Sequence, residues 1–304
     1  MTRAVTIGGG VVLGGGSRLV FIGGPCVIES ETHAVDMAGR LREACSEYGV
    51  AYIFKASYDK AQRSSVRSYR GPGIARGLDI LAAVKRQARV PVLSDVHCVT
   101  QVAAAAEVLD VLRIPAFLAR QTDIIVACGR TGKPVEIKKG QYMAPEEMEA
   151  AAEKVRSTGN DRVILTERGT TFGYGNLVVD MRALPIMRRL GYPVVFDGSH
   201  PVQIPGGAKT HSAGRRDMVP YLARAAVAAG VDGLFLEVHD DPDRAPCDGA
   251  ISITPDELRL LLAEVVAIDD VVKAGERRRA RGADQDALTA ARAGTRAGEH
   301  VTAG

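Results

Sequence analysis

A repeated order of short apolar runs and longer amphipathic segments constrains the fold of this chain more than any other feature. Runs of four to six mainly apolar residues recur roughly every 30 residues, at 19–23, 50–54, 91–94, 109–112, 134–137, 162–165, 193–196 and 233–236. Apolar strands that alternate with helices are typical of a parallel sheet covered by helices. Eight such repeats predict a closed (β/α)8 barrel, the TIM barrel, within one α/β domain.

The segments between the runs have the spacing of amphipathic helices. Helices are expected at Glu31–Tyr48, Ala75–Gln87, Pro145–Ser157, Ala213–Ala229 and Pro255–Val272. An open, doubly wound sheet is the alternative arrangement. It normally carries a glycine fingerprint at the start of its first helix, and the sequence Gly-Gly-Pro-Cys-Val-Ile-Glu at 23–29 lacks that fingerprint.

The two ends of the chain differ from the barrel segment at 19–273. Residues 1–18 hold a short apolar segment between glycine clusters, which predicts a small β-hairpin. A glycine-rich phosphate loop is the alternative, but no helix pattern opens after these glycines. Residues 274–304 are rich in Ala, Arg and Gly with almost no large apolar residue, so a disordered tail is expected there.

Composition limits the classes of function. The 304 residues are 46% hydrophobic and carry a net charge of only +3, which argues against nucleic acid as a partner. No apolar run approaches the roughly 18 residues of a membrane span, and no signal peptide is evident, so a cytoplasmic protein without membrane contact is expected. The five scattered cysteines do not form a disulfide framework.

Charged and titratable residues follow every predicted strand, where a barrel of this type places its active site. They are Cys26; Lys55 and Lys60; Asp95 and His97; Arg120; Lys138 and Lys139; Glu167 and Arg168; Asp197 and His200; and Glu237 and His239. Loops are polar in any protein, so one such residue means little. A set that follows all eight strands indicates an active site.

Two chemical groups separate within this set. One is cationic and could bind two phosphates and a carboxylate: Lys55, Lys60, Arg63, Arg120, Lys138 and Arg168. The other offers one thiolate, one imidazole and two carboxylates: Cys26, His200, Glu237 and Asp248. Such mixed ligands suit Zn²⁺, Fe²⁺, Co²⁺ or Mn²⁺, although their spacing matches no metal motif and each residue could be structural.

Long blocks of sequence resemble the 3-deoxy-D-manno-octulosonate 8-phosphate synthase family from about Phe21 to Val272. They include Phe-Lys-Ala-Ser-Tyr-Asp-Lys-Ala-Gln-Arg-Ser-Ser at 54–65, Ser-Asp-Val-His at 94–97, Ile-Pro-Ala-Phe-Leu-Ala-Arg-Gln-Thr-Asp at 114–123, Lys-Lys-Gly-Gln at 138–141 and Glu-Arg-Gly-Thr-Thr-Phe-Gly-Tyr at 167–174. The resemblance implies a (β/α)8 barrel, usually a homotetramer, that condenses phosphoenolpyruvate with the aldose phosphate arabinose 5-phosphate in lipopolysaccharide biosynthesis.

The resemblance also implies roles for individual residues. Gly-Pro-Cys at 24–26 is similar to the metal-dependent branch of the family, so a divalent transition metal (Zn, Fe, Co or Mn) would be bound by Cys26, His200, Glu237 and Asp248. The implied catalytic residues are Lys55, Lys60, Asp95, His97, Lys138, Arg168 and His200. The implied substrate-binding residues are Ser57, Gln62, Arg63, Ser64, Arg120, Gln141, Asp197 and Gln203, with Arg63 and Ser64 on the sugar phosphate and Arg120 in a site across a subunit boundary.

Because the sequence departs from the family at three places, acceptor sugars other than arabinose 5-phosphate stay as alternatives. Gln62 replaces the usual Asn, the loop at 249–253 is more apolar, and the tail is additional. The same chemistry could use an amino sugar or erythrose 4-phosphate, although Lys-Ala-Gln-Arg-Ser-Ser at 60–65 argues against the latter. A Schiff-base aldolase acting through Lys138, or a phosphosugar-binding homologue without turnover, are the remaining alternatives.

Overall fold

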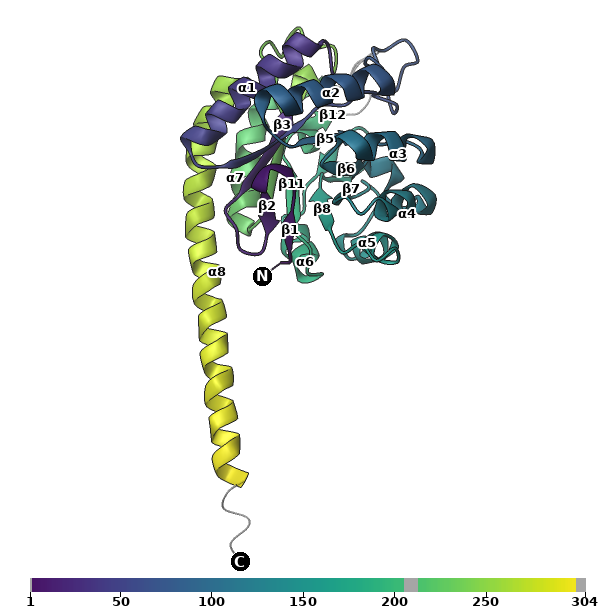
Figure 1. The fold of residues 1–304 in the computed structure, drawn as a ribbon. Coiled ribbons are helices and arrows are strands. Elements are labelled where there is room, and N and C mark those ends of the chain that lie inside the picture. The colour runs from purple at the N-terminus through teal and green to yellow at the C-terminus, as the bar shows by residue number, and fades with distance from the viewer. Residues whose placement is uncertain (1, 205–212, 299–304) are drawn as a thin grey trace, which may run out of the picture.

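The computed structural model describes residues 2–204 and 213–298, with side chains described as far as Arg281. Eight parallel strands close into a barrel in the order in which they follow along the chain (Figure 1). They are β3 (Val20–Gly24), β4 (Ala51–Lys55), β5 (Val92–Asp95), β6 (Val111–Ile114), β7 (Val135–Lys138), β8 (Val163–Glu167), β11 (Val194–Asp197) and β14 (Gly233–Glu237). The fold class predicted from the sequence is therefore confirmed.

Helices surround the barrel and cover the outer side of each strand. They are α1 (Glu31–Glu47), α2 (Ile74–Ala88), α3 (Val99–Val108), α4 (Thr122–Arg130), α5 (Met148–Arg156), α6 (Ala183–Arg189), α7 (Val219–Ala229) and α8 (Pro255–Gly298). The apolar side of each helix is buried against the strands, as Met37, Ala38 and Leu41 of α1 illustrate. This burial is the main source of stability in such a layer arrangement.

The predicted strands agree with the observed ones to within about two residues at either end, as 109–112 against β6 illustrates. The helix predicted at Ala213–Ala229 was wrong over its first six residues. Ala213–Gly214 form strand β13, which pairs with β12 (Gln203–Ile204), and α7 begins only at Val219. Pro220 occupies the first turn of α7, where its missing N–H is tolerated and its fixed φ favours the start of a helix.

An N-terminal hairpin covers the amino-terminal ends of the barrel strands. Strands β1 (Ala4–Thr6) and β2 (Val12–Gly14) pair in antiparallel register. Val5, Ile7, Val11 and Leu13 are buried in one cluster with residues from inside the barrel. Gly14 has a φ of +86°, and a Cβ there would lie 2.2 Å from the carbonyl oxygen of Arg3, so this turn requires glycine.

The C-terminal segment differs from the disordered tail expected from residue 274. Helix α8 continues without interruption to Gly298 and extends beyond the barrel as a single helix (Figure 1). Ala and Arg, which dominate its second half, have high helix propensities even where little apolar surface is available to bury. The part of the tail at 299–304 lies outside the described residues. The boundary between barrel and tail at 273 stays a prediction.

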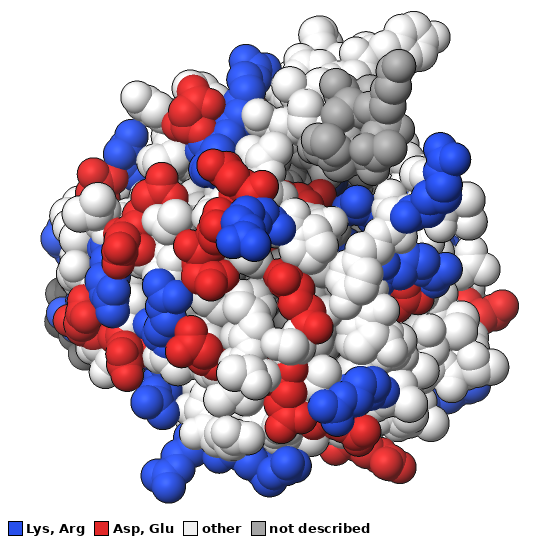
Figure 2. All heavy atoms as spheres, turned by 90° about the horizontal axis from the view of Figure 1, so that it is seen from above, with Lys and Arg blue, Asp and Glu red and all other residues white. Residues whose placement is uncertain are grey.

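The carboxyl ends of the strands lie on the face seen in Figure 2. Basic and acidic side chains are interspersed over the described part of this face. Within residues 2–204 and 213–298, none of the helices combines the length and the apolar character that crossing a membrane demands.

Candidate active site at the carboxyl ends of the strands

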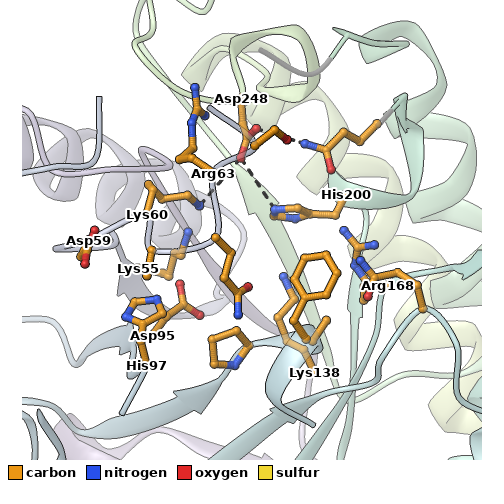
Figure 3. A pocket seen from close by; sticks show the side chains of 18 residues that line it. Lys55, Asp59, Lys60, Arg63, Asp95, His97, Lys138, Arg168, His200 and Asp248 are labelled. Carbon is orange, nitrogen blue, oxygen red and sulfur yellow. Dashed lines mark hydrogen bonds and ion pairs between the residues drawn. The ribbon is translucent and has the colours of Figure 1, made fainter. Parts of the chain in front are cut away.

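A cavity of about 210 Å³ opens at the carboxyl ends of the barrel strands. Thirteen of the predicted site residues line it: Lys55, Lys60, Gln62, Arg63, Ser64, Asp95, His97, Lys138, Gln141, Arg168, His200, Gln203 and Asp248. Lys60, Lys138 and Arg168 point toward a common space beside His200 (Figure 3). Polar groups are tolerated at the carboxyl ends of the strands because the last inward-facing side chains have no apolar layer above them.

Two buried cations form one side of the cavity. Lys138, at the end of β7, lies 2.6 Å from Asp197 Oδ2. Arg168 follows β8, is only 4% exposed, and its Nε and Nη1 have no hydrogen-bond partner among the described residues. Burial lowers the pKa of both side chains below their ordinary values, although Asp197 opposes this shift for each. Unpaired buried donors are costly, so this pair is suited to an anionic ligand.

A proton-transfer group lies on another side of the cavity. Ser57 donates a hydrogen bond to Asp95 Oδ2 at 2.9 Å. Burial acts to raise the pKa of Asp95, but Lys55 and Arg113 outweigh it and hold that pKa below its usual range. Burial lowers the pKa of His97, whose buried Nδ1 has no hydrogen-bond partner in the described chain. His97 is therefore neutral near pH 7 and able to exchange a proton.

The four predicted metal ligands come together in two overlapping groups that share Asp248. His200, Glu237 and Asp248 form one group, in which His200 Nε2 lies 3.9 Å from a carboxylate oxygen of each of the other two. Cys26 and Asp248 belong to the other, with Cys26 Sγ 3.0 Å from Asp248 Oδ2. The four residues come from positions as far apart as 26 and 248 in the chain, so only the closed barrel brings them together.

The surroundings of this group favour a cation. His200 Nδ1 lies 2.8 Å from Asp197 Oδ2, which directs Nε2 toward Glu237 and Asp248. Lys55 Nζ lies 2.8 Å from Glu237 Oε1, while the buried Oε2 of that carboxylate has no hydrogen-bond partner among the described residues. Sulfur, nitrogen and carboxylate donors therefore fit a divalent transition metal at this position.

The basic loop after β4 covers this group from one side. Lys60 Nζ lies 3.8 Å from Asp248 Oδ2, and Arg63 donates a hydrogen bond to Cys247 Sγ at 2.8 Å. Gln203, at the start of β12, donates to Asp248 Oδ1 at 3.2 Å. Gln62 and Ser64 complete the loop's contribution to the cavity lining. The loop thus brings cations and hydroxyl groups to the end of the cavity opposite Lys138 and Arg168 (Figure 3).

Several residues from the predicted set turn away from the cavity. Arg120 is exposed and lies 3.9 Å from Glu147, so within a single chain it does not reach the cavity. Lys139 is buried beside Glu167 and hydrogen-bonds to Thr170. His239 contacts Glu29 at 2.7 Å. Neighbouring positions of a strand end face opposite sides, which explains why Lys138 points inward and Lys139 outward.

Sequence reasoning missed several residues that the fold brings to the site. Cys247 Sγ lies 3.0 Å from Cys26 Sγ, and its position next to Asp248 in the sequence was the available signal. Arg113 and Glu136 form a fully buried ion pair of 3.1 Å inside the barrel. The ring of Phe235 lies within 5.3 Å of Lys55, Arg113 and Lys138, a contact between one aromatic face and three cations that no sequence pattern indicates.

Comparison with known proteins gives consistent matches over nearly the whole barrel. Three curated relatives carry the name 2-dehydro-3-deoxyphosphooctonate aldolase. The protein of Citrifermentans bemidjiense is 57% identical over 272 residues, 90% of this chain and 99% of that protein. The protein of Syntrophotalea carbinolica is 59% identical over 263 residues, 86% and 95% of the two chains. The protein of Geobacter sulfurreducens is 57% identical over 273 residues, 90% and 100% of the two chains.

The matches confirm the resemblance found in the sequence blocks around Lys55, Asp95, Lys138 and Arg168. Residues 3–274 also match the DAHP synthetase I family, and this range covers the hairpin and all eight barrel strands. The chain belongs to the DAHP synthetase I family.

Proposed function

We propose that this chain is a transferase that condenses phosphoenolpyruvate with D-arabinose 5-phosphate and water. The products are 3-deoxy-D-manno-octulosonate 8-phosphate and phosphate. The observation that carries this proposal is Arg168, which lines the same cavity as Lys138 and whose buried guanidinium has two nitrogens without a hydrogen-bond partner in the described part of the chain. The names of the relatives, 2-dehydro-3-deoxyphosphooctonate aldolase, support the same sugar acid.

The residues on the two sides of the cavity would bind the two substrates. Lys138, Arg168 and Gln141 bind the phosphate and carboxylate of phosphoenolpyruvate, together with Lys55, Ser57 and Lys60. Arg63 and Ser64 bind the phosphate of the sugar, and Gln62 contacts a sugar hydroxyl. This arrangement holds C3 of phosphoenolpyruvate against the aldehyde carbon. Because phosphoenolpyruvate is a weak carbon nucleophile, this positioning and the surrounding charges provide most of the lowering of the barrier to bond formation.

His97 and Asp95 carry out proton transfer in this proposal. Carbon–carbon bond formation leaves positive charge at C2 and an alkoxide on the former aldehyde oxygen. Water adds to C2 with loss of one proton, and the C2 hydroxyl loses the second proton as the tetrahedral intermediate expels phosphate. Of these two protons, one neutralises the alkoxide and the other leaves with the phosphate. A neutral His97 can accept a proton from the water and return it to the departing phosphate, while the anionic Asp95 stabilises the protonated imidazole.

We also propose that Cys26, His200, Glu237 and Asp248 bind a divalent transition metal, Zn, Fe, Co or Mn. A metal held by these four residues would polarise the aldehyde or position the attacking water. The unpartnered Glu237 Oε2 and the orientation of His200 by Asp197 support this assignment. Removal of metal by a strong chelator is expected to abolish phosphate release, and addition of a divalent transition metal to restore it. Full activity without detectable metal would contradict the metal assignment and leave the condensation standing.

We propose a homotetramer that works in the cytoplasm. Exposed Phe117, Tyr142 and Phe172 on neighbouring loops support assembly, because a second copy of the chain would cover them. Arg120, on the same side, is then available to a site in another subunit. The cysteines are all unpaired, which supports a reducing compartment.

One assay tests the reaction. Phosphate release from phosphoenolpyruvate is measured with arabinose 5-phosphate, with erythrose 4-phosphate, with an unphosphorylated aldose and with no acceptor, and the product is identified by mass. Release is expected only with an aldose phosphate, and fastest with arabinose 5-phosphate. Release that does not depend on an acceptor would reject the condensation.

A further inference from the structure

A second group of metal-binding side chains lies outside the cavity. Glu29 lies two residues before α1, His33 lies in its first turn, and His239 and Asp240 follow the end of β14. Glu29, His33 and His239 each present a donor atom within 4.8 Å of the others. None of these residues lines the active-site cavity or belongs to the group formed by Cys26, His200, Glu237 and Asp248.

The two carboxylates lie on opposite sides of the two imidazole rings. Glu29 Oε1 is 2.7 Å from His239 Nε2 and 3.9 Å from His33 Nδ1. Asp240 Oδ1 is 2.9 Å from His33 Nε2 and 3.2 Å from His239 Nδ1. A cation on the Glu29 side would therefore contact one nitrogen of each histidine, while Asp240 accepts the proton on the other nitrogen of each ring. This is how proteins commonly orient metal-binding histidines.

Charge and burial also favour a cation here. Neither Glu29 nor Asp240 forms an ion pair with a Lys or Arg among the described residues; their ionic contacts are with the two histidines alone. The His239 side chain is 8% exposed and that of His33 17%, and the buried His33 Nδ1 has no hydrogen-bond partner in the described chain. Two carboxylates thus lie beside the histidine rings, and within the described chain no Lys or Arg compensates their charge.

We propose that Glu29, His33 and His239 form a second site for a divalent transition metal such as Zn²⁺, Co²⁺ or Ni²⁺. Two imidazoles and one carboxylate suit these ions, with water completing the coordination. The bound ion links the start of α1 to the loop after β14, the loop that continues to Cys247 and Asp248. The three ligands include no sulfur. Co²⁺ bound here therefore gives no thiolate charge-transfer band, which distinguishes it from Co²⁺ at the site that includes Cys26.

One contact competes with the cation. The backbone N–H of Asp241 donates to His239 Nδ1 at 2.9 Å, so in the metal-free protein the ring proton resides on Nε2 and is donated to Glu29. Metal binding at Nε2 moves that proton to Nδ1, where Asp240 accepts it, and the Asp241 contact is lost.

Binding of Co²⁺ to the full chain, measured by equilibrium dialysis with absorption spectra, tests the proposal. Wild type is expected to bind two equivalents, and only the equivalent at Cys26 gives a thiolate-to-cobalt charge-transfer band. Glu29→Gln is expected to bind one equivalent with this band unchanged. Glu31→Gln is the matched control, because it removes the same charge two residues away on α1 and is expected to retain two equivalents. Asp240→Asn is expected to weaken the second equivalent roughly 10- to 100-fold.

The outcomes separate the two metal sites. Binding of a single equivalent with the charge-transfer band by wild type would overturn the second site, as would two equivalents retained by Glu29→Gln. A single equivalent without the band that is lost in Glu29→Gln would support the second site and reject the metal site at Cys26. Circular dichroism and phosphate release in each variant confirm that the fold is intact.

Discussion

At the residue scale, the site combines cations that differ in how far their charge is already compensated. Lys138 has a carboxylate partner, Asp197, whereas two buried donors of Arg168 have no hydrogen-bond partner among the residues that the structure describes. Arg63 lies across the cavity beside Cys247. An incoming anion therefore gains most from Arg168, because no existing ion pair has to be broken.

The positions of these cations predict which substrate is bound more weakly after each single substitution. Arg168→Ala and Lys138→Ala are expected to raise the KM for phosphoenolpyruvate, and Arg63→Ala that for the sugar phosphate. Loss of one charge-assisted contact to phosphate costs about 2 to 3 kcal/mol, or roughly 30- to 150-fold in kcat/KM. Steady-state kinetics with each substrate varied in turn measures the split. Equal weakening of both substrates by all three variants would show that the cavity has no separate subsites.

The protonation of Cys26 predicts how metal binding depends on pH. Burial, with added effects of Cys247 and Asp248, raises the pKa of Cys26 well above its usual value, so the metal-free protein carries a thiol near pH 7. Burial lowers the pKa of His200, which is therefore already neutral, and Asp248 is already ionised because the charge of Lys60 opposes burial and lowers its pKa. Metal binding as thiolate then displaces one proton, and the affinity rises about tenfold per pH unit.

Titration with Co²⁺ between about pH 6.5 and 8 checks this dependence, since the thiolate charge-transfer band reports this site alone. A slope of about one proton is expected. Cys26→Ser, which removes the group that releases the proton, is expected to lose the band and to bind more weakly. An affinity of the wild-type site that does not change with pH would mean that Cys26 is not a ligand.

At the element scale, the N-terminal hairpin acts as the closing layer of the barrel. Leu13 in β2 is fully buried among Val20, Val111 and Val195 from the barrel strands. Gly14 allows the backbone to pass close to its neighbours, since a Cβ there would lie 2.2 Å from the carbonyl oxygen of Arg3 and 2.9 Å from Cγ of Pro193, the residue before β11. The hairpin therefore contributes to stability at the end of the barrel that carries no active-site residue.

Leu13→Ala is expected to lower the free energy of unfolding by about 2 to 5 kcal/mol, because it leaves a cavity between the hairpin and the strands. Val12→Ala, the neighbouring residue that is only half-buried, is the control and is expected to cost about 1 kcal/mol or less. Denaturant unfolding monitored by circular dichroism measures both. Equal losses would mean that the hairpin does not pack against the barrel interior as described, and kcat is expected to stay unchanged in both variants.

At the scale of the whole molecule, exposed aromatic side chains gather on the loops after β6, β7 and β8. Phe117, Tyr142 and Phe172 are more than half exposed. The loops touch one another, since Thr171 N–H donates to the Gln141 carbonyl and Gly140 lies against Tyr142 and Ala116. Large apolar side chains grouped in this way commonly mark an interface between subunits.

Phe172→Ser is expected to shift the proposed tetramer toward smaller species and to lower activity, because the site proposed to use Arg120 of another subunit would be incomplete. Leu260→Ser on α8 is the matched control, since Leu260 is 73% exposed and Phe172 71%. Light scattering coupled to size-exclusion chromatography measures the mass of each variant. A wild-type monomer, or a Leu260→Ser protein that dissociates as readily, would contradict this surface as the interface.

The sequence alone determined the fold class, the eight strands and the set of side chains at their ends. The reason is local: the alternation of apolar runs and amphipathic helices depends on neighbouring residues, and in a parallel barrel every strand ends on the same face. The grouping of Lys55, Lys138 and Arg168 followed from that rule together with the family blocks.

Only the tertiary structure decided which of those side chains meet. The direction of a side chain depends on the register of its strand, so Lys138 faces the cavity while the adjacent Lys139 is buried elsewhere. The closeness of Cys26 to Cys247, and of Glu29 to His239, depends on closure of the barrel between β14 and β3, which joins the two ends of the chain. Such contacts arise from packing over more than 200 residues, and no local pattern encodes them.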